Sequence, residues 1–200
     1  DICRYLTKNI KINYLSSITH IKYQSKYWTV TVNNKYKKKF KNLIVTCPFP
    51  QVKSLCSKYL GNKIKSLEVK MEPNITVMAA YNDYKNLPIS SIVFDDEILG
   101  WASNENSKQR FNSDLSLWTI QSNIKFAKKF INKFKKNKKQ TIQIILKKFQ
   151  KLAGLSYKNI TFSSIHGWKY AYAYKNLKMN SLWSNKYKIG VCGDWFLGPK

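Results

Sequence analysis

Several residue types that shape a fold are scarce in this 200-residue chain. It has two arginines, Arg4 and Arg110, against 34 lysines, and only 7 glycines and 5 prolines. No apolar run approaches the roughly 20 residues that a membrane-spanning helix needs, and the N-terminus has no apolar signal-peptide region. We therefore expect a cytoplasmic chain without a membrane anchor. Its hydrophobic content of 44% excludes a disordered chain, because it is enough for a buried core.

The cysteines are also few. They are scattered at Cys3, Cys47, Cys56 and Cys192. None belongs to a Cys-x-x-Cys pair, and only His20 and His166 could join them as ligands, so we expect no metal site. Without a secretory context, reduced thiols are the better interpretation than disulfides.

Acidic residues are scarce too, and the net charge is +26. One interpretation is a basic nucleic-acid-binding module with interleaved aromatic residues, which would bind in a strongly salt-dependent way. However, base-reading surfaces rely on arginine. Lys, Asn and Ile make up 73 residues, whereas Ala, Gly, Arg and Pro make up only 21. This skew follows A/T-rich codons, so we favour solvated lysines and expect no nucleic-acid partner.

The hydrophobic pattern predicts a mixed α/β fold. A helix end at 1–8 is followed by strands at 15–23, 27–32, 36–40 and 42–46, a helix at 51–59 that Gly61 ends, and strands at 74–81, 90–94, 98–103 and 115–121. Two amphipathic helices follow at 123–136 and 141–152, the first capped by Ser122 and the second closed by Gly154. Strands at 160–170 and 188–192 complete the pattern. The middle strands fit a mixed or antiparallel sheet.

The last strand runs directly into Gly193-Asp194. A glycine at a strand end lets the backbone approach a ligand closely, and an aspartate there can accept hydrogen bonds from hydroxyls. The alternative interpretation is a simple turn after a buried strand.

Five segments of the chain occur in the order found in one enzyme family. They are Ile18-Thr19-His20-Ile21 with Tyr27-Trp28-Thr29-Val30, Leu43 to Gln51, Leu99 to Asn104 with Ser107 to Arg110, His166 to Ala171, and Gly193 to Gly198. Together they resemble the renalase-like branch of the flavin amine oxidase family, over nearly the whole chain.

The resemblance implies a two-domain fold with an FAD-binding α/β domain and a substrate domain on a mixed sheet. By position, residues 1–60 and 186–200 belong to the FAD-binding domain, and 61–185 to the substrate domain. The implied activity is FAD-dependent oxidation of a small molecule, an amine or a reduced nicotinamide, with hydride transfer to the flavin.

The resemblance also implies site residues. Ile18 looks like the strand residue at the adenine end of FAD. Thr46, Cys47 and Pro48 match the crossing near the dinucleotide, and Gly193, Asp194 and Trp195 match the turn at the ribityl-pyrophosphate region. Trp168 and Tyr170 match the substrate side. Beside them, His166 is either a general base or a hydrogen-bonded core residue, and we favour the core residue.

The chain departs from the family pattern in four places. No GxGxxG occurs, although this motif would seat the pyrophosphate. Gly167 stands where an arginine is common, no proline follows Tyr170-Ala171, and the helix expected after the last glycine turn is missing. We therefore expect an internal fragment that does not hold FAD by itself.

Overall fold

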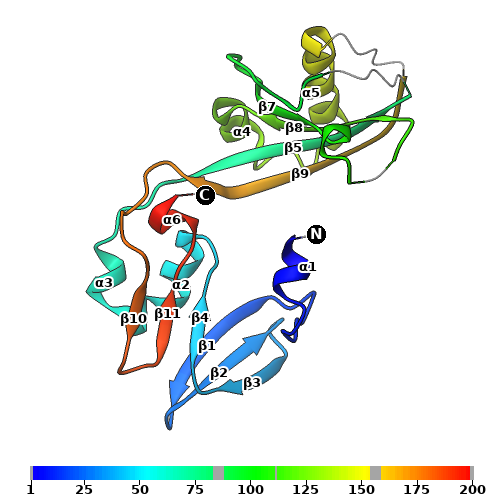
Figure 1. The fold of residues 1–200 in the computed structure, drawn as a ribbon. Helices are drawn as coiled ribbons and strands as arrows, with labels where there is room; N and C mark the ends of the chain where they lie inside the picture. Colours follow the sequence, from blue (N-terminus) through cyan, green and yellow to red (C-terminus); the bar gives the residue numbers. More distant parts are fainter. Residues whose placement is uncertain (1, 83–87, 111, 154–158, 199–200) are drawn as a thin grey trace. The chain divides into compact units, whose positions relative to one another are not determined.

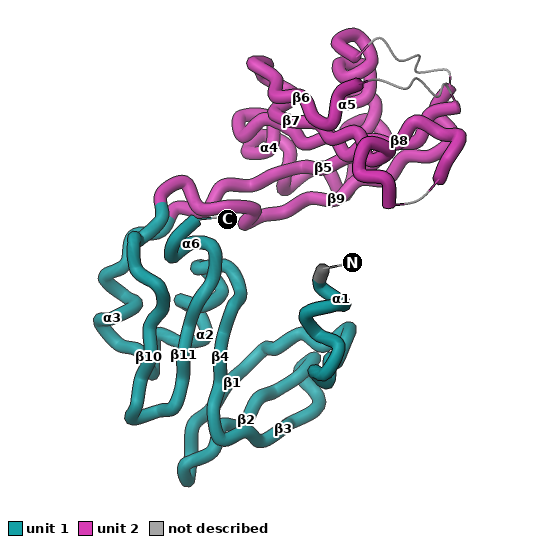
Figure 2. Tube along the Cα trace, in the orientation of Figure 1, with its two compact units in different colours: residues 1–69, 176–200 teal, residues 70–175 magenta. Residues whose placement is uncertain are grey.

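A computed structural model describes residues 2–82, 88–110, 112–153 and 159–198, in two compact units (Figures 1 and 2). Unit 1 comprises residues 1–69 and 176–200, and unit 2 comprises residues 70–175. The chain thus leaves unit 1 once and returns to it. The sequence predicts domain boundaries after residues 60 and 185, and the structure has them after residues 69 and 175. The first predicted boundary is thus nine residues too early and the second ten residues too late.

Unit 1 begins with helix α1 (Ile2–Leu6) and an antiparallel sheet in the order β1-β2-β3. Its strands are β1 (Ile18–Gln24), β2 (Tyr27–Val32) and β3 (Tyr36–Phe40). The strands expected at 15–23 and 27–32 form an antiparallel hairpin, and its two turn residues, Ser25 and Lys26, have φ of 50° and 64°. Successive side chains of a strand alternate between faces, so β2 buries Trp28, Val30 and Val32 on one side.

The second sheet of unit 1 has the order β10-β11-β4. Its strands are β10 (Leu182–Ser184), β11 (Ile189–Val191) and β4 (Leu43–Val45). The pair β4 and β11 is parallel, with Ile189 opposite Leu43 and Val191 opposite Val45. Three helices complete the unit: α2 (Phe49–Leu60), α3 (Asn62–Lys65) and α6 (Asp194–Leu197). The one-turn helix α6 lies inside the segment 193–198, so it is not the helix that the family pattern places after that turn.

An aromatic cluster joins the two sheets of unit 1 to α2. Trp28 lies 4.6 Å from Tyr59 and 5.1 Å from Tyr23, measured between ring centroids. Tyr187, from the β10–β11 turn, lies 5.4 Å from Tyr59 and 5.6 Å from Tyr23. The Trp28 indole also donates a hydrogen bond of 2.8 Å to the Tyr187 carbonyl. This cluster therefore holds segments together that are far apart in the sequence.

Unit 2 contains a five-stranded sheet in the order β6-β7-β8-β5-β9. Its strands are β5 (Met71–Tyr81), β6 (Ser91–Val93), β7 (Leu99–Asn104), β8 (Ser116–Ser122) and β9 (Ile160–Ala173), and the 3-10 helix η1 (Asn106–Lys108) follows β7. Every pairing is antiparallel. Of the two arrangements that the pattern left open, the antiparallel sheet is therefore the one found, and the mixed sheet that the resemblance implied for this domain is not. β6, β7 and β8 follow one another without the crossover helices that parallel neighbours need.

Helices α4 (Ile124–Phe130) and α5 (Lys138–Ala153) cover one face of this sheet. The side chain of Asn123, not Ser122, caps α4 by accepting the Lys125 N–H at 2.8 Å. The Ser122 hydroxyl is already engaged, because it accepts the Ile75 N–H in the sheet. The helix expected over 123–136 ends at Phe130, and Gly154, expected to close the second helix, lies outside the described residues.

The helix lysines point to solvent as expected, except for the half-buried Lys148, which pairs with Asp96 at 2.6 Å. Phe134 and Phe149 are buried in the core of unit 2, and Phe130 packs against it. These three aromatic side chains therefore form no exposed stripe. In the described part of the chain, no helix is long and apolar enough to cross a bilayer.

Candidate functional site

The carboxyl ends of β4 and β11 bring together two turns that the sequence analysis singled out. The strands end in register, and the Cys192 N–H donates to the Val45 carbonyl at 3.2 Å. One step further, the Trp195 indole donates to the Cys47 carbonyl at 3.3 Å. The turn at 46–48 and the turn at 193–195 therefore meet at one edge, as expected.

At this edge Thr46 and Asp194 are the exposed polar side chains, whereas Cys47 and Pro48 are half-buried. The Asp194 carboxylate forms no hydrogen bond or ion pair with another described residue, so its oxygens are available as acceptors. Burial raises the pKa of the Cys47 thiol, although a backbone hydrogen bond partly opposes it. A neutral thiol is a poor nucleophile. The groups that a ligand could contact at this edge are therefore the Thr46 hydroxyl and the Asp194 carboxylate.

Trp195 has a structural role at this edge. Its side chain is fully buried and lies 5.1 Å from the Phe49 ring and 4.0 Å from the Phe196 ring. A Cβ on Gly193 would come within 2.7 Å of the Trp195 indole nitrogen. The glycine of the Gly-Asp pair therefore leaves room for the indole, and the Trp195 side chain has no exposed surface for a ligand.

Ile18 lies elsewhere in unit 1. It is the first residue of β1, opposite Val32, in the three-stranded sheet. The structure therefore does not bring Ile18 to the edge formed by β4 and β11, although its side chain is 42% exposed.

The substrate-side residues His166 and Trp168 lie at alternate positions of β9, so they share one face of the unit 2 sheet. Tyr170 is half-buried and lies where the register between β9 and β5 shifts. His166 and Trp168 have ring centroids 4.3 Å apart, and Trp168 is 53% exposed. His166 is exposed as well. Its favoured interpretation as a core residue is therefore wrong, because the helices cover the opposite face.

Gly167 shows which face the helices cover. A Cβ at this position would collide with the Phe134 ring and come within 2.9 Å of the Ile131 side chain. An arginine, common here in the family that the sequence resembles, would not fit beneath Phe134. This departure from the family pattern follows from packing in unit 2.

Three side chains of β5 that the sequence analysis did not single out share the face of Trp168. Asn74 pairs with Trp168 and Thr76 with His166, and both are buried, with the Thr76 hydroxyl donating to the Asn74 amide oxygen at 3.0 Å. Met78 on the same face is 45% exposed. The sequence does carry a signal that could have identified Asn74 and Thr76, because polar residues occur there at alternate positions of an otherwise apolar strand. In the described part of the chain, no group of His, Cys, Asp and Glu could hold a metal ion.

The chain is similar to solved structures of oxidoreductases. It matches a protein of Exiguobacterium sp. 255-15 assigned as a protoporphyrinogen oxidase, with a TM-score of 0.67 and 13% identity, over 98% of this chain and 46% of that one. It also matches an oxidoreductase from Methanosarcina mazei, with a TM-score of 0.55 and 10% identity, over 90% of this chain and 44% of that one. The chain therefore shares the fold of part of each of these two structures.

The expected fold class is confirmed by this likeness, because the mixed α/β chain matches part of the fold of the first of these structures. The chain spans less than half the length of each of these two structures. No protein-family model matches the sequence.

Proposed function

We propose that this chain is part of a renalase-like, FAD-dependent oxidoreductase that acts on a small molecule, an amine or a reduced nicotinamide, in the cytoplasm. The observation that carries the proposal is the edge at the ends of β4 and β11, where two turns meet and the Thr46 and Asp194 side chains are exposed. Ligands of open α/β sheets bind outside the carboxyl ends of parallel strands.

The residues at this edge fit the hydroxyl-bearing part of FAD. A carboxylate accepts hydrogen bonds from hydroxyls, and a threonine hydroxyl both donates and accepts. Asp194 and Thr46 would therefore hold ribityl hydroxyls, next to the backbone of 47–48 and 193. The pyrophosphate would be held by residues outside this chain, since its seven glycines form no GxGxxG.

The substrate would lie against β9 at Trp168 and Tyr170. FAD, when bound, supplies the hydride acceptor. Trp168 would provide an apolar wall that positions the substrate and excludes water, and His166 beside it would hold or take up a proton at its exposed imidazole. The nucleic-acid alternative loses support, because Phe134 and Phe149 lie in the core of unit 2.

The test uses the full-length protein that contains this chain. A carboxylate hydrogen-bonded to a hydroxyl contributes about 1.5–3 kcal/mol, so Asp194→Ala should lower FAD affinity about ten- to a hundredfold. Asp114→Ala, at an exposed aspartate of unit 2, is the matched control and should keep full flavin absorbance.

A second variant separates the substrate side from the cofactor side. Trp168→Ala should keep its flavin but slow anaerobic flavin reduction by up to about a hundredfold, because the substrate is less well positioned. Full flavin retention in Asp194→Ala would refute the role of Asp194, and a parental reduction rate would refute that of Trp168. An unmutated protein that binds no flavin would refute the proposed function.

A further inference from the structure

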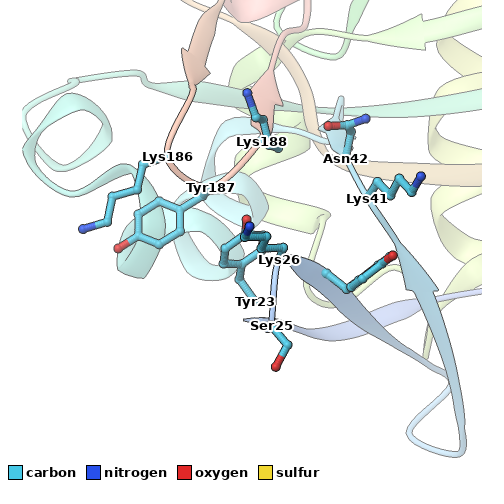
Figure 3. A pocket seen from close by; sticks show the side chains of 9 residues that line it. Tyr23, Ser25, Lys26, Lys41, Asn42, Lys186, Tyr187 and Lys188 are labelled. Atoms are coloured by element: carbon cyan, nitrogen blue, oxygen red, sulfur yellow. The ribbon is translucent and has the colours of Figure 1, made fainter.

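Unit 1 contains a second surface of interest, a hollow of about 770 Å³ (Figure 3). This volume lies within the roughly 300–1,000 Å³ typical of small-molecule sites. The hollow is lined by Tyr23, Ser25, Lys26, Tyr27, Lys41, Asn42, Lys186, Tyr187 and Lys188. We refer to it as the lysine hollow.

The lysine hollow is separate from the proposed flavin edge. It is formed by the β1–β2 turn, the β10–β11 turn and the residues just before β4. These lie at the amino ends of β4 and β11, whereas Thr46 and Asp194 follow the carboxyl ends. Three residues of strand place the two ends about 10 Å apart.

The charge of the lysine hollow is not neutralised by protein groups. Four of its nine lining residues are lysines and none is acidic, although lysine makes up only 34 of 200 residues overall. Residues 1–69 and 176–200 carry 18 basic and 3 acidic side chains. Among the described residues, no ion pair involves a lysine of the hollow. An anion would therefore meet several uncompensated ammonium groups.

The backbone places two of these lysines at unusual positions. Lys26 and Lys188 have φ of 64° and 52°, in the left-handed region that favours glycine and asparagine. Asparagine codons are as A/T-rich as lysine codons, and Asn33 and Asn34 occupy the corresponding turn of the next hairpin. Codon composition alone therefore does not explain lysine at 26 and 188. Non-glycine residues in this region often occur at binding sites.

The wall of the hollow is held in place by the aromatic cluster. The Tyr187 carbonyl accepts the Trp28 indole N–H, and the Lys188 carbonyl accepts the Leu43 N–H at 3.1 Å. Figure 3 shows the Tyr23 and Tyr187 side chains near each other, with their ring centroids 5.6 Å apart, and Lys26, Lys41 and Lys188 on three separate segments. Because these lysines are exposed, their ammonium groups can turn toward an anion without displacing protein atoms.

We propose that the lysine hollow binds a small ligand that carries a chain of phosphates. Lysine interacts with phosphate as a point charge, and several ammonium groups around one concavity suit several linked phosphates better than a single carboxylate. The tyrosine phenols add hydrogen-bond donors, and their rings add a surface on which a nucleotide base can stack.

The experiment titrates the full-length protein by calorimetry at physiological ionic strength, with inorganic tripolyphosphate and with ATP as the two probes. Both carry the phosphate chain, and tighter binding of ATP would identify a nucleotide as the source. The test variant combines Lys41→Gln with Lys188→Gln. The control combines Lys37→Gln with Lys39→Gln, which removes the same charge from exposed positions of β3 outside the hollow.

We expect one saturable site and a loss of affinity of at least about tenfold in the test variant, because hydrogen bonds to charged groups are lost. The control should stay within about twofold of the parent. Equal losses in both variants, or no saturable site, would overturn the proposal. Tighter binding of a single-stranded oligonucleotide than of either probe, weakened equally by both variants, would overturn it in favour of a general nucleic-acid surface.

Discussion

The two units carry the same number of basic residues but neutralise them differently. Each has 18, while unit 2 has seven acidic residues and unit 1 has three. In unit 2, Glu72 is buried and its carboxylate lies 2.8 Å from the Lys128 amine. Glu105 pairs in the same way with Lys108 and Arg110. All ion pairs between described residues lie in unit 2. The larger number of acidic residues in unit 2 thus accompanies its ion pairs, whereas the lysines of unit 1 are mostly uncompensated.

The cores differ as well. Unit 2 has one contiguous apolar core between its sheet and two helices, centred on residues such as Ile75, Trp118 and Phe149. Unit 1 has two three-stranded sheets, which the cluster around Trp28 links. Small sheets bury little surface by themselves. We therefore expect unit 1 to depend on a few aromatic contacts, and unit 2 on close packing and ion pairs.

The largest expected effect is in unit 1. Trp28→Ala should lower the free energy of unfolding by about 3–5 kcal/mol, because it removes a fully buried ring and the hydrogen bond to Tyr187. Urea denaturation would measure the loss in free energy of unfolding. Amide hydrogen exchange would show whether the lost protection lies in unit 1. Tyr27→Ala, at an exposed neighbour, is the control. A loss no larger than that of the control would show that the cluster does not hold unit 1 together.

A smaller effect is expected in unit 2. Gly167→Ala should cost about 1–3 kcal/mol, because the new methyl group collides with the Phe134 ring. Chemical denaturation of Gly167→Ala, of Phe134→Leu and of the double variant measures the coupling free energy between the two positions. The double variant should lose less stability than the sum of the two single variants. Simple additivity would mean that the close contact between Gly167 and Phe134 does not constrain this position.

The smallest effect is a difference in acid sensitivity between the units. Burial alone would raise the pKa of Asp96, but hydrogen bonds from Lys148 and from two backbone N–H groups outweigh it and lower the pKa. For Glu105, hydrogen bonds from Lys108 and Thr119 likewise outweigh burial. A lowered folded-state pKa contributes stability at neutral pH, which is lost as pH falls through the folded-state value.

Unit 2 should therefore lose more stability than unit 1 between neutral pH and about pH 3. Hydrogen exchange across this range measures both units in one sample. The double variant Asp96→Asn with Glu105→Gln should flatten the pH dependence of unit 2 and leave unit 1 unchanged. An equal acid response in both units would contradict the comparison.

Local pattern was enough to predict most strands and helices. The alternation around Trp28 and Val30 predicted β2, and the apolar spacing at 142–152 predicted a helix inside α5. The helix over 123–136 was predicted too long, because apolar spacing continues to Phe134 while α4 ends at Phe130. β10 was missed, because three residues form a strand only through pairing with β11.

For the candidate site, the sequence by itself determined that the segments ending at 46–48 and 193–195 follow apolar strands. The resemblance, which matches both segments to dinucleotide-side positions, implied that they meet. Only the tertiary structure decided that Trp195 is buried, that His166 is exposed and that Phe134 covers Gly167. It also assembled the lysine hollow from three separate turns. The physical reason is that a residue's type and spacing set its local geometry, whereas its exposure depends on which distant segments pack over it.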